Sequence, residues 1–248
     1  MSQKVNVFLP MRAGSNRVLK KNTRAFSGLS GGLCRIKIEQ LLKCKNLDRI
    51  IVSTDDQTVV KICSEFCSAK IQIVPRPQAL ASSIASTDDL IRHVPEIMPK
   101  GHILWTHVTS PFITSDIYDE LISEYFKRLS NFDSLMTVTK LQKFIWNDDA
   151  PICYDREVEK WPRTQTIAPL WEINSGAFLA SKDVYIKNHD RIGDKPFLFE
   201  LDQLVSFDID WPTDFKVAEA LYAAQQRYEA DTVNEKNANI PKTKVSFG

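Results

Sequence analysis

Residues 10–22 combine basic side chains with a glycine–serine turn, directly after a short apolar run. Backbone N–H groups of such a turn can point at an anion while flanking cations neutralise its charge. The segment has neither the Gly-Lys-Ser/Thr of a P-loop nor the Gly-x-Gly-x-x-Gly of dinucleotide sites. A phosphate cradle and a solvated basic loop are both compatible with it. The residues that would form the cradle are Arg12, Gly14, Ser15, Arg17 and Lys21.

Two carboxylates, Asp208 and Asp210, are separated by one residue near the carboxyl end of the chain. On a strand, residues at this spacing point to the same face, so the pair could grip one divalent cation with oxygen ligands. Pro212 suits the first turn of a following helix, and the same acids together with Asp214 could interact with the dipole of that helix. The pattern leaves two interpretations, a metal site and a helix cap.

Three further polar segments are candidates for contacts with the rest of a ligand. Residues 107–111 follow a buried apolar run and should reach the same site, although a lone histidine is often structural. Residues 163–165 could bind a carboxylate bidentately or form an ordinary surface salt bridge. Residues 174–176 offer partners for hydroxyl groups or form a simple turn. The individual candidates are His107, Thr109, Ser110, Arg163, Gln165 and Asn174.

Alternating strands and helices are predicted to position these groups. The expected strands are 5–10, 49–54, 71–74 and 102–107, and the expected helices are 33–45, 59–66, 86–97 and 115–128. Continuously apolar strands separated by helices are typical of a mostly parallel sheet covered on both faces. Ligands of such sheets bind beyond the carboxyl ends of the strands. The loops after Leu9, Thr54, Val74 and Thr106 should therefore open onto one site.

Two segments depart from this alternation. Residues 140–175 are rich in aromatic and turn-forming residues and show neither helical nor strand periodicity. They are an insertion or arm whose aromatics would suit a dimer contact, or a local hairpin that covers the protein's own core. Residues 229–248 are polar and rich in Asn and Lys, and we expect a mobile tail there. The main domain is thus expected to span residues 1–228.

The charge balance limits the partners of the chain. Its 32 basic and 31 acidic residues give a net charge of +1, yet residues 1–45 alone carry ten basic side chains and one acid. A neutral total argues against nucleic acid or an anionic membrane as a partner, because both need a broad surface of one sign. Lys37, Lys43 and Lys45 are expected on the solvated side of a helix. With no apolar run long enough for a membrane span and no signal peptide, a cytoplasmic location is expected.

In their order along the chain, these motifs resemble the acylneuraminate cytidylyltransferase family, the CMP-sialic acid synthetases and their relatives that activate other nine-carbon acidic sugars. The similarity covers about residues 4–225. The matching segments are Arg12-Ala13-Gly14-Ser15-Asn16-Arg17 with Lys21-Asn22, Ser53-Thr54-Asp55, Arg76-Pro77 with Leu80-Ala81 and Ser86-Thr87, Thr109-Ser110-Pro111, Arg163 with Gln165, and Asp208-Ile209-Asp210.

The resemblance implies a Rossmann-like three-layer α/β/α nucleotidyltransferase domain with a mostly parallel sheet and a small dimerisation arm. It implies a homodimer that uses CTP, Mg²⁺ and an acidic α-keto sugar, releases pyrophosphate and makes a CMP-sugar for cell-surface glycans. By position, Arg12, Gly14, Ser15, Arg17, Lys21, Arg76 and Thr87 would bind the nucleotide, Asp208 and Asp210 the metal, and His107, Thr109, Ser110, Arg163, Gln165 and Asn174 the sugar. Arg12, Lys21 and Asp210 would be catalytic.

Three positions depart from the family pattern. Asn16 replaces the usual lysine, which removes one phosphate contact that Arg17 could supply. His107 and Val108 stand where Gln-Pro is common, and Ile173 stands where many sialic acid enzymes have an arginine. The acceptor could therefore differ from N-acetylneuraminate. An eight-carbon acid sugar, as in CMP-Kdo synthetases, a metal-dependent glycosyltransferase and a catalytically silent binding module are the alternatives.

Overall fold

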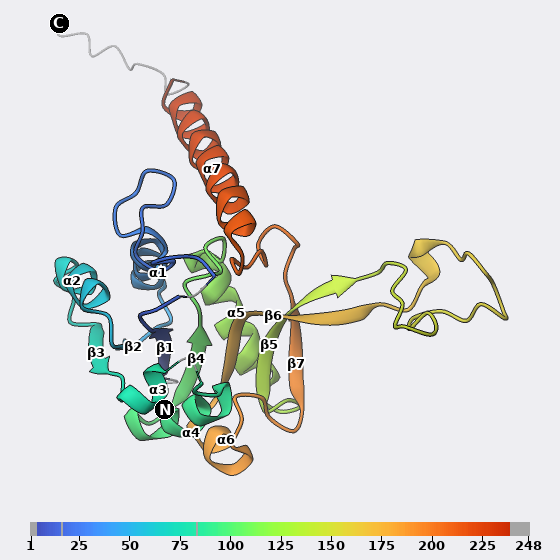
Figure 1. Cartoon of the computed structure of the whole chain (residues 1–248), viewed down its shortest axis with the longest axis horizontal. Coiled ribbons are helices and arrows are strands. Elements are labelled where there is room, and N and C mark those ends of the chain that lie inside the picture. The colour runs from blue at the N-terminus through green and yellow to red at the C-terminus, as the bar shows by residue number, and fades with distance from the viewer. Residues whose placement is uncertain (1–3, 16, 83, 239–248) are drawn as a thin grey trace, which may run out of the picture.

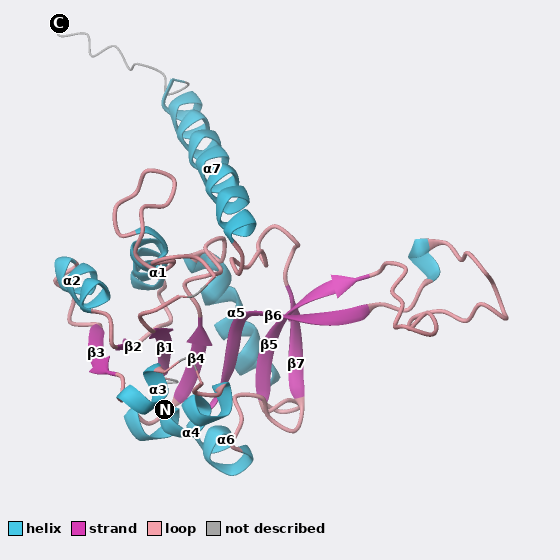
Figure 2. Cartoon of the chain, in the orientation of Figure 1, coloured by secondary structure: helices cyan, strands magenta, loops and turns pink. Residues whose placement is uncertain are grey.

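The computed structural model describes residues 4–15, 17–82 and 84–238 of the 248-residue chain. These residues form a seven-stranded sheet in the order β3-β2-β1-β4-β6-β5-β7 (Figures 1 and 2). All neighbouring pairs are parallel except those that involve β6, which runs antiparallel to β4 and β5. The strands are β1 (Val5–Met11), β2 (Arg49–Thr54), β3 (Ile71–Pro75), β4 (His102–Thr106), β5 (Ser134–Leu141), β6 (Leu170–Ser181) and β7 (Pro196–Glu200). The prediction of a mostly parallel sheet is confirmed.

Helices cover both faces of the sheet and make the fold a three-layer α/β/α sandwich. Alternate residues of β1 point to opposite sides, so that Val7 and Leu9 join one buried cluster and Phe8 joins the other. The first cluster packs against α1, α2, α5 and the start of α7, and the second packs against α4 and α6. The helices are α1 (Gly32–Lys43), α2 (Gln57–Glu65), α3 (Gln78–Ala81), α4 (Thr87–Ile97), α5 (Ser115–Arg128), α6 (Lys182–Asn188) and α7 (Pro212–Ala238), with the short 3₁₀ helix η1 (Thr164–Thr166).

Local capping fixes where two of the predicted helices begin. The Asp56 carboxylate accepts the Thr58 N–H at 2.8 Å and caps α2. Ser86 and Asp89 form a capping box at the start of α4, in which each side chain accepts the backbone N–H of the other residue. The loop after β3, which contains α3, therefore ends at a fixed point beside β4. The short helix α3 was not predicted.

Residues 142–169 form an arm that projects away from the sheet beyond the ends of β5 and β6 (Figure 1). Neither core cluster contains a residue of this segment among the described residues. The interpretation as a hairpin that covers the protein's own core is therefore wrong. The arm instead exposes aromatic side chains, with 47% of Trp146 and 68% of Trp161 accessible to solvent.

The carboxyl-terminal helix α7 is longer than the sequence analysis expected, because residues 229–238 continue it. No glycine occurs between Pro212 and the next proline, Pro241, and this stretch is rich in alanine, glutamine and glutamate, so helix propensity favours continuation. The expected mobile tail is wrong for residues 229–238, and its remainder, 239–248, lies outside the described residues. Among the described helices, none is long and apolar enough to cross a membrane.

Lys37 is fully buried, which contradicts its expected place on a solvated helix face. Its ammonium group donates hydrogen bonds to the Ser110 carbonyl at 2.9 Å and to the Tyr118 hydroxyl at 2.7 Å. Burial holds the pKa of Lys37 well below its usual value. Lys37 is spaced four residues from both Leu33 and Leu41 on the buried face of α1, but its polar partners are more than 70 residues away and do not follow from that spacing. The lysine ties α1 to the loop after β4.

We predict that the Lys37→Met variant alters how stability depends on pH. A lysine whose pKa is lowered by folding binds fewer protons in the folded than in the unfolded state. Wild-type stability should therefore rise relative to the variant as pH increases from neutral toward the unfolded lysine pKa of about 10.4. Chemical denaturation of both proteins at several pH values measures this difference. A constant or shrinking difference would contradict the prediction.

Candidate active site

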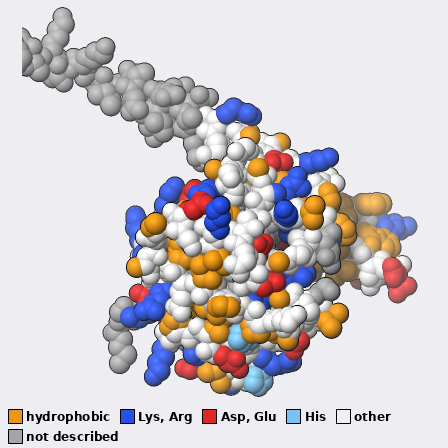
Figure 3. All heavy atoms as spheres, turned by 60° about the vertical axis from the view of Figure 1, so that its left-hand side comes forward, with side chains coloured by type: hydrophobic (Ala, Val, Ile, Leu, Met, Phe, Trp, Pro, Cys, Tyr) orange, Lys and Arg blue, Asp and Glu red, His pale blue; other side chains and the backbone are white. Residues whose placement is uncertain are grey.

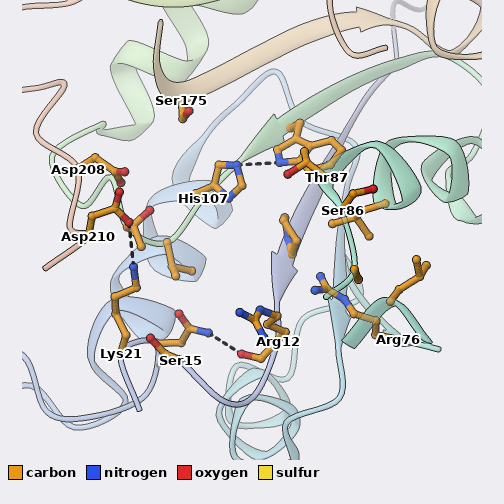
Figure 4. A pocket seen from close by; sticks show the side chains of 18 of the residues that line it. Arg12, Ser15, Lys21, Arg76, Ser86, Thr87, His107, Ser175, Asp208 and Asp210 are labelled. Carbon is orange, nitrogen blue, oxygen red and sulfur yellow. Dashed lines mark hydrogen bonds and ion pairs between the residues drawn. The ribbon is translucent and has the colours of Figure 1, made fainter. Parts of the chain in front are cut away.

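A cavity of about 680 Å³ opens beyond the carboxyl ends of β1, β3 and β4. Residues of the loops that follow these strands line it, together with residues from the segments around 175, 191 and 208 (Figure 4). Five basic side chains and two carboxylates of the described residues take part in the lining, namely Arg12, Arg17, Lys21, Arg76, Arg191, Asp208 and Asp210. The loop after β2 was expected to join them, but Asp55 instead accepts the Ala13 N–H at 2.7 Å and supports the loop after β1.

The loop after β1 brings Arg12, Ser15 and Lys21 to one side of the cavity (Figure 4). Gly14 has φ +74°, a left-handed conformation that favours glycine, and it forms the turn beside Ser15 without lining the cavity itself. The Asn22 amide donates to the Arg12 carbonyl at 3.2 Å and holds the two ends of the loop together. In the predicted phosphate cradle, Arg12 and Lys21 therefore face the cavity, and the turn at Gly14 supports them from outside the lining.

Asp208 and Asp210 lie on an irregular segment, so the expected strand is wrong, although both side chains still line the cavity. Their placement comes from Ile209, which is fully buried in the larger core cluster. The Ile209 N–H donates to the Thr109 carbonyl at 3.0 Å, and its carbonyl accepts the Lys21 ammonium at 2.6 Å. This anchoring turns the flanking carboxylates toward the opening, across from the β1 loop (Figure 4).

The acid that caps α7 is Asp214. Its carboxylate accepts the N–H groups of Asp210 and Trp211 at 3.1 and 2.7 Å and so caps α7. Asp210 is therefore not needed as a cap and pairs instead with two cations of the β1 loop. Its Oδ1 lies 3.0 Å from the Arg17 guanidinium and 3.6 Å from the Lys21 ammonium.

The second carboxylate, Asp208, is partly buried, and its surroundings disfavour its charged form. Burial raises its pKa above the usual value and the neighbouring Asp210 adds to the shift, while Thr109 and Lys21 oppose it. Its Oδ1 is a buried atom without a hydrogen-bond partner among the described residues. A buried carboxylate oxygen without a partner is costly unless a ligand completes it.

The two carboxylates could together hold a hard divalent cation. The described ranges contain no group of three or more His, Cys, Asp or Glu side chains arranged around a common point. A cation between Asp208 and Asp210 would therefore take its other ligands from water or substrate oxygens. Mg²⁺ commonly binds in this way, through one or two carboxylates and phosphate oxygens. The donor set fits Mg²⁺.

Arg76 and Thr87 line the opposite side of the cavity (Figure 4). The Arg76 guanidinium donates to the hydroxyl and the carbonyl of Ser53 at 3.2 and 3.0 Å, and burial lowers its pKa to about 10. Thr87 is the first residue of α4, directly after the capping Ser86. A rigid arginine and a helix N-terminus with hydroxyls suit the polar edge of a neutral or anionic ligand.

His107 lines the cavity between these two sides as a neutral side chain. Burial and the positive charge of Arg191, followed by those of Lys21, Lys37 and Arg76, lower the pKa of His107 to about 3. The Trp105 indole N–H lies 2.9 Å from His107 Nε2, which leaves the ring proton on Nδ1. His107 can therefore donate a hydrogen bond to a ligand but does not act as a proton carrier near neutral pH.

The other predicted sugar-side residues lie in different places. Thr109 lines the cavity, but Ser110 is fully buried and does not. The Asn174 side chain is buried and bonded to Thr137, Thr139 and the Gly176 N–H, so it holds a bulge in β6 and does not line the cavity. Arg163 and Gln165 are exposed on the projecting arm, outside the lining of the cavity.

Ser175 and Arg191 line the cavity although the sequence analysis did not select them. The bulge held by Asn174 gives Ser175 a positive φ of 56° and places its side chain above His107 (Figure 4). The order Asn-Ser-Gly was a signal for a turn, which is where Ser175 lies. No sequence pattern marked Arg191, which belongs to a polar loop between α6 and β7.

The site can be compared with known proteins on this basis. The chain is 24% identical over 231 residues to a pseudaminic acid cytidylyltransferase of Campylobacter jejuni, covering 86% of this chain and 94% of that protein. It is 23% identical over 215 residues to an N-acylneuraminate cytidylyltransferase of Streptococcus agalactiae, covering 84% of this chain and half of the relative. The relative from Streptococcus is thus about twice the matched length.

Solved structures show the same fold at low sequence identity. A CMP:2-keto-3-deoxy-manno-octonic acid synthetase complexed with CTP has a TM-score of 0.63 at 15% identity, over 90% of this chain and 99% of that one. A 4-diphosphocytidyl-2C-methyl-D-erythritol synthase from Anaerococcus prevotii has a TM-score of 0.65 at 14% identity, over 89% and 96%. The family model described as cytidylyltransferase matches residues 7–238. This match spans nearly the whole described chain, and the protein belongs to the cytidylyltransferase family.

Proposed function

We propose that the protein transfers CMP from CTP to a nine-carbon acidic sugar and releases pyrophosphate. The observation that carries the proposal is the contact of Lys21 with the carbonyl of Ile209 and the carboxylate of Asp210. It brings a cation of the β1 loop and the only two carboxylates of the described cavity lining to one point. A triphosphate with a bound cation needs this combination of positive side chains and oxygen ligands.

The nucleotide would lie across the cavity from the β1 loop to the start of α4. Arg12, Ser15 and Lys21 would hold the triphosphate, with Arg17 close enough to contribute the charge that Asn16 lacks. Asn16 itself lies outside the described residues. Arg76 and Thr87 would contact the cytidine. The identity of the base is supported by the family to which the chain belongs.

Asp208 and Asp210 would hold Mg²⁺, whose charge would neutralise phosphate oxygens and could lower the pKa of the attacking hydroxyl. In the described structure Asp210 pairs with Arg17 and Lys21. A triphosphate would attract these two cations and release Asp210 for the metal. The buried Oδ1 of Asp208 would gain the partner that the protein itself does not provide.

The reaction joins the anomeric oxygen of the sugar to the α-phosphorus of CTP and breaks the bond between that phosphorus and the bridging oxygen of the β-phosphate. Pyrophosphate takes the bonding electrons, and the hydroxyl proton passes to water. Catalysis would come from in-line positioning and from charge neutralisation by Arg12 and Lys21. His107, which stays neutral, would orient the sugar and would not act as a base.

The acidic sugar is supported by the names of relatives that act on pseudaminic acid and N-acylneuraminate. An eight-carbon acid sugar is the second candidate, since the solved synthetase for 2-keto-3-deoxy-manno-octonic acid shares the fold. The CMP-sugar would serve cell-surface glycan synthesis, in the cytoplasm where CTP is made. The glycosyltransferase alternative has no support among these relatives.

We also propose that the protein acts as a homodimer through its arm. Trp146 is 47% and Trp161 68% exposed there, and aromatic side chains are enriched at protein interfaces. Arg163 and Gln165 on the same arm are outside the cavity of their own chain. In a symmetric pair, each arm would supply these two residues to the site of the other subunit.

Pyrophosphate release tests the function directly. Purified protein with Mg²⁺ and CTP should release pyrophosphate only when an acidic α-keto sugar from a panel of eight- and nine-carbon acids is present. Omission of either substrate, replacement of CTP by UTP, and addition of a chelator are the controls. Release that is independent of the sugar, or silence with every acid of the panel, would contradict the function.

The metal proposal predicts that two substitutions both lower turnover but differ in their effect on stability. Asp210→Asn should lower turnover about 100-fold or more, since metal charge contributes several kcal/mol to such transition states. Its unfolding midpoint should stay near that of the wild type, because Asp210 and its partner Arg17 are half-exposed and such ion pairs add little.

Asp208→Asn should also lower turnover, yet it should unfold at a higher temperature than the wild type at pH 7 in the absence of ligands. A carboxyl whose pKa is raised by folding destabilises the folded state at pH values above that pKa. The neutral amide of the Asn variant removes this destabilisation. The folded wild type should regain this stability only as the pH falls through the raised pKa of Asp208. Differential scanning calorimetry with a chelator measures both midpoints. Full activity of either variant would refute the metal assignment.

Complementation tests the shared site. Arg163→Ala and Asp210→Asn should each be nearly inactive, but mixed dimers contain one site with both residues intact. Equal mixing with subunit exchange should restore about a quarter of the wild-type activity. Each variant mixed with itself is the control. A monomer in analytical ultracentrifugation, or no gain on mixing, would contradict the dimer with swapped arms.

A further inference from the structure

Arg191 is a basic side chain of the cavity that has no role in the proposed binding of the nucleotide. It lies on the loop 189–195 between α6 and β7 and lines the same cavity as His107 and Ser175. Its guanidinium carbon is 3.7 Å from the ring centroid of Phe178 and 4.9 Å from that of Trp105. The guanidinium is thus stacked on two core aromatics, with its edge available to the cavity.

No carboxylate is paired with this guanidinium among the described residues. The adjacent Asp190 accepts the backbone N–H of Arg191 at 2.6 Å instead. Two other arginines differ in this respect, since Arg17 pairs with Asp210 and Arg128, which also stacks on a ring, pairs with Glu124. Burial lowers the pKa of Arg191, which shows that its surroundings do not compensate the charge fully. A partly buried cation of this kind attracts an anionic ligand.

The loop that carries Arg191 is fixed before any ligand binds. The Asp133 carboxylate accepts the N–H groups of Asp194 and Lys195 at 2.8 and 3.0 Å, and the Ser134 hydroxyl accepts the Gly193 N–H at 2.8 Å. A Cβ at Gly193 would lie 2.2 Å from the Asp133 carboxylate, so the close approach requires glycine. A guanidinium held in this way loses little conformational entropy when it binds a ligand.

The groups around Arg191 suit an acid that also carries hydroxyls. His107 is neutral, in part because Arg191 lies close to it, and it can donate from Nδ1. Ser175 adds a hydroxyl above His107 (Figure 4). Arg12 and Lys21, which would hold the triphosphate, lie on the other side of His107 in the same view. Arg191 is thus a further cation of the cavity beside those assigned to the triphosphate.

We propose that Arg191 binds the carboxylate of the acidic sugar, so that each chain carries its own carboxylate-binding residue. The inference rests on the proposed function, because it names the group that this cavity selects in its second substrate. A planar guanidinium binds a carboxylate through two parallel hydrogen bonds, which a neutral ester cannot accept with the same strength. Arg191 is then a residue that determines specificity for acids.

The test compares two substrates and three variants. The substrates are the acid of the panel that gives the fastest pyrophosphate release and the methyl ester of the same acid. The variants are Arg191→Gln, which removes the charge, Arg191→Lys, which keeps it, and Arg128→Gln as the control. Arg128 is a suitable match because it stacks on Phe197 at 4.2 Å outside the cavity.

Arg191→Gln should raise the KM for the acid about 10- to 100-fold, the range expected for a lost charged hydrogen bond, and leave the KM for CTP nearly unchanged. The preference of the wild type for acid over ester should disappear in this variant. Arg191→Lys should give an intermediate KM, and Arg128→Gln should match the wild type. The unfolding midpoints of all variants identify any that do not fold.

The outcomes separate the two proposals. Silence of the wild type with the whole panel overturns the proposed function and this inference with it. An active wild type whose acid preference survives Arg191→Gln overturns the inference alone. A rise in the KM for CTP would assign Arg191 to the nucleotide, and equal losses for acid and ester with a lower unfolding midpoint would assign it to the core. Both results refute a carboxylate-binding role.

Discussion

The candidate site depends on how one apolar residue, Ile209, is held between two loops. Its side chain is buried in the core, its N–H binds the loop after β4, and its carbonyl binds Lys21 from the loop after β1. The core thus fixes the position of the residue, and the two acids on either side of it have to face outward. The segment 202–211 is neither helix nor strand, and Ile209, together with Val205 and Phe207, packs it against the core. Burial of Ile209 in the core therefore places the carboxylates of Asp208 and Asp210 opposite the basic loop after β1.

The distribution of charge over the cavity follows from the same geometry. Although the net charge of the chain is only +1, the described lining of the cavity contains five basic side chains and two carboxylates. On the face shown in Figure 3, basic and acidic side chains are interspersed and no broad region of one sign is present. Within the described lining of the cavity, by contrast, cations outnumber carboxylates in a concave region. Such a region suits small anions better than an extended polyanion.

Much of the fold could be predicted from the sequence because the signals are local. The helix α5 occupies the residues that were expected, and the apolar runs of β1, β2 and β4 are strands. The predicted cations Arg12, Arg17 and Lys21 also line the cavity, since the loop at the end of a parallel strand is a reliable location, and so do Asp208 and Asp210. The local sequence pattern was sufficient to predict these features.

What could not be predicted depends on distant contacts. Lys37 has the side chain of a typical surface residue, yet it lies on the buried face of α1 with Leu33 and Leu41, and its bonds to Ser110 and Tyr118 compensate its burial. Ser110 and Asn174 have suitable polar groups, yet burial and neighbouring hydrogen bonds keep them out of the cavity. Arg191 is held at the cavity by the ring of Phe178 on β6 and by that of Trp105 on β4, which is far away in sequence. Periodicity carries no information about such contacts.

A crystal structure with CTP and Mn²⁺ in place of Mg²⁺ tests the central claim most directly, because anomalous scattering locates the metal. The account predicts an anomalous peak within bonding distance of Asp208 and Asp210, triphosphate oxygens on Arg12 and Lys21, and the salt bridge between Arg17 and Asp210 broken. A nucleotide bound away from the loop after β1, or a metal that touches neither carboxylate, would contradict it.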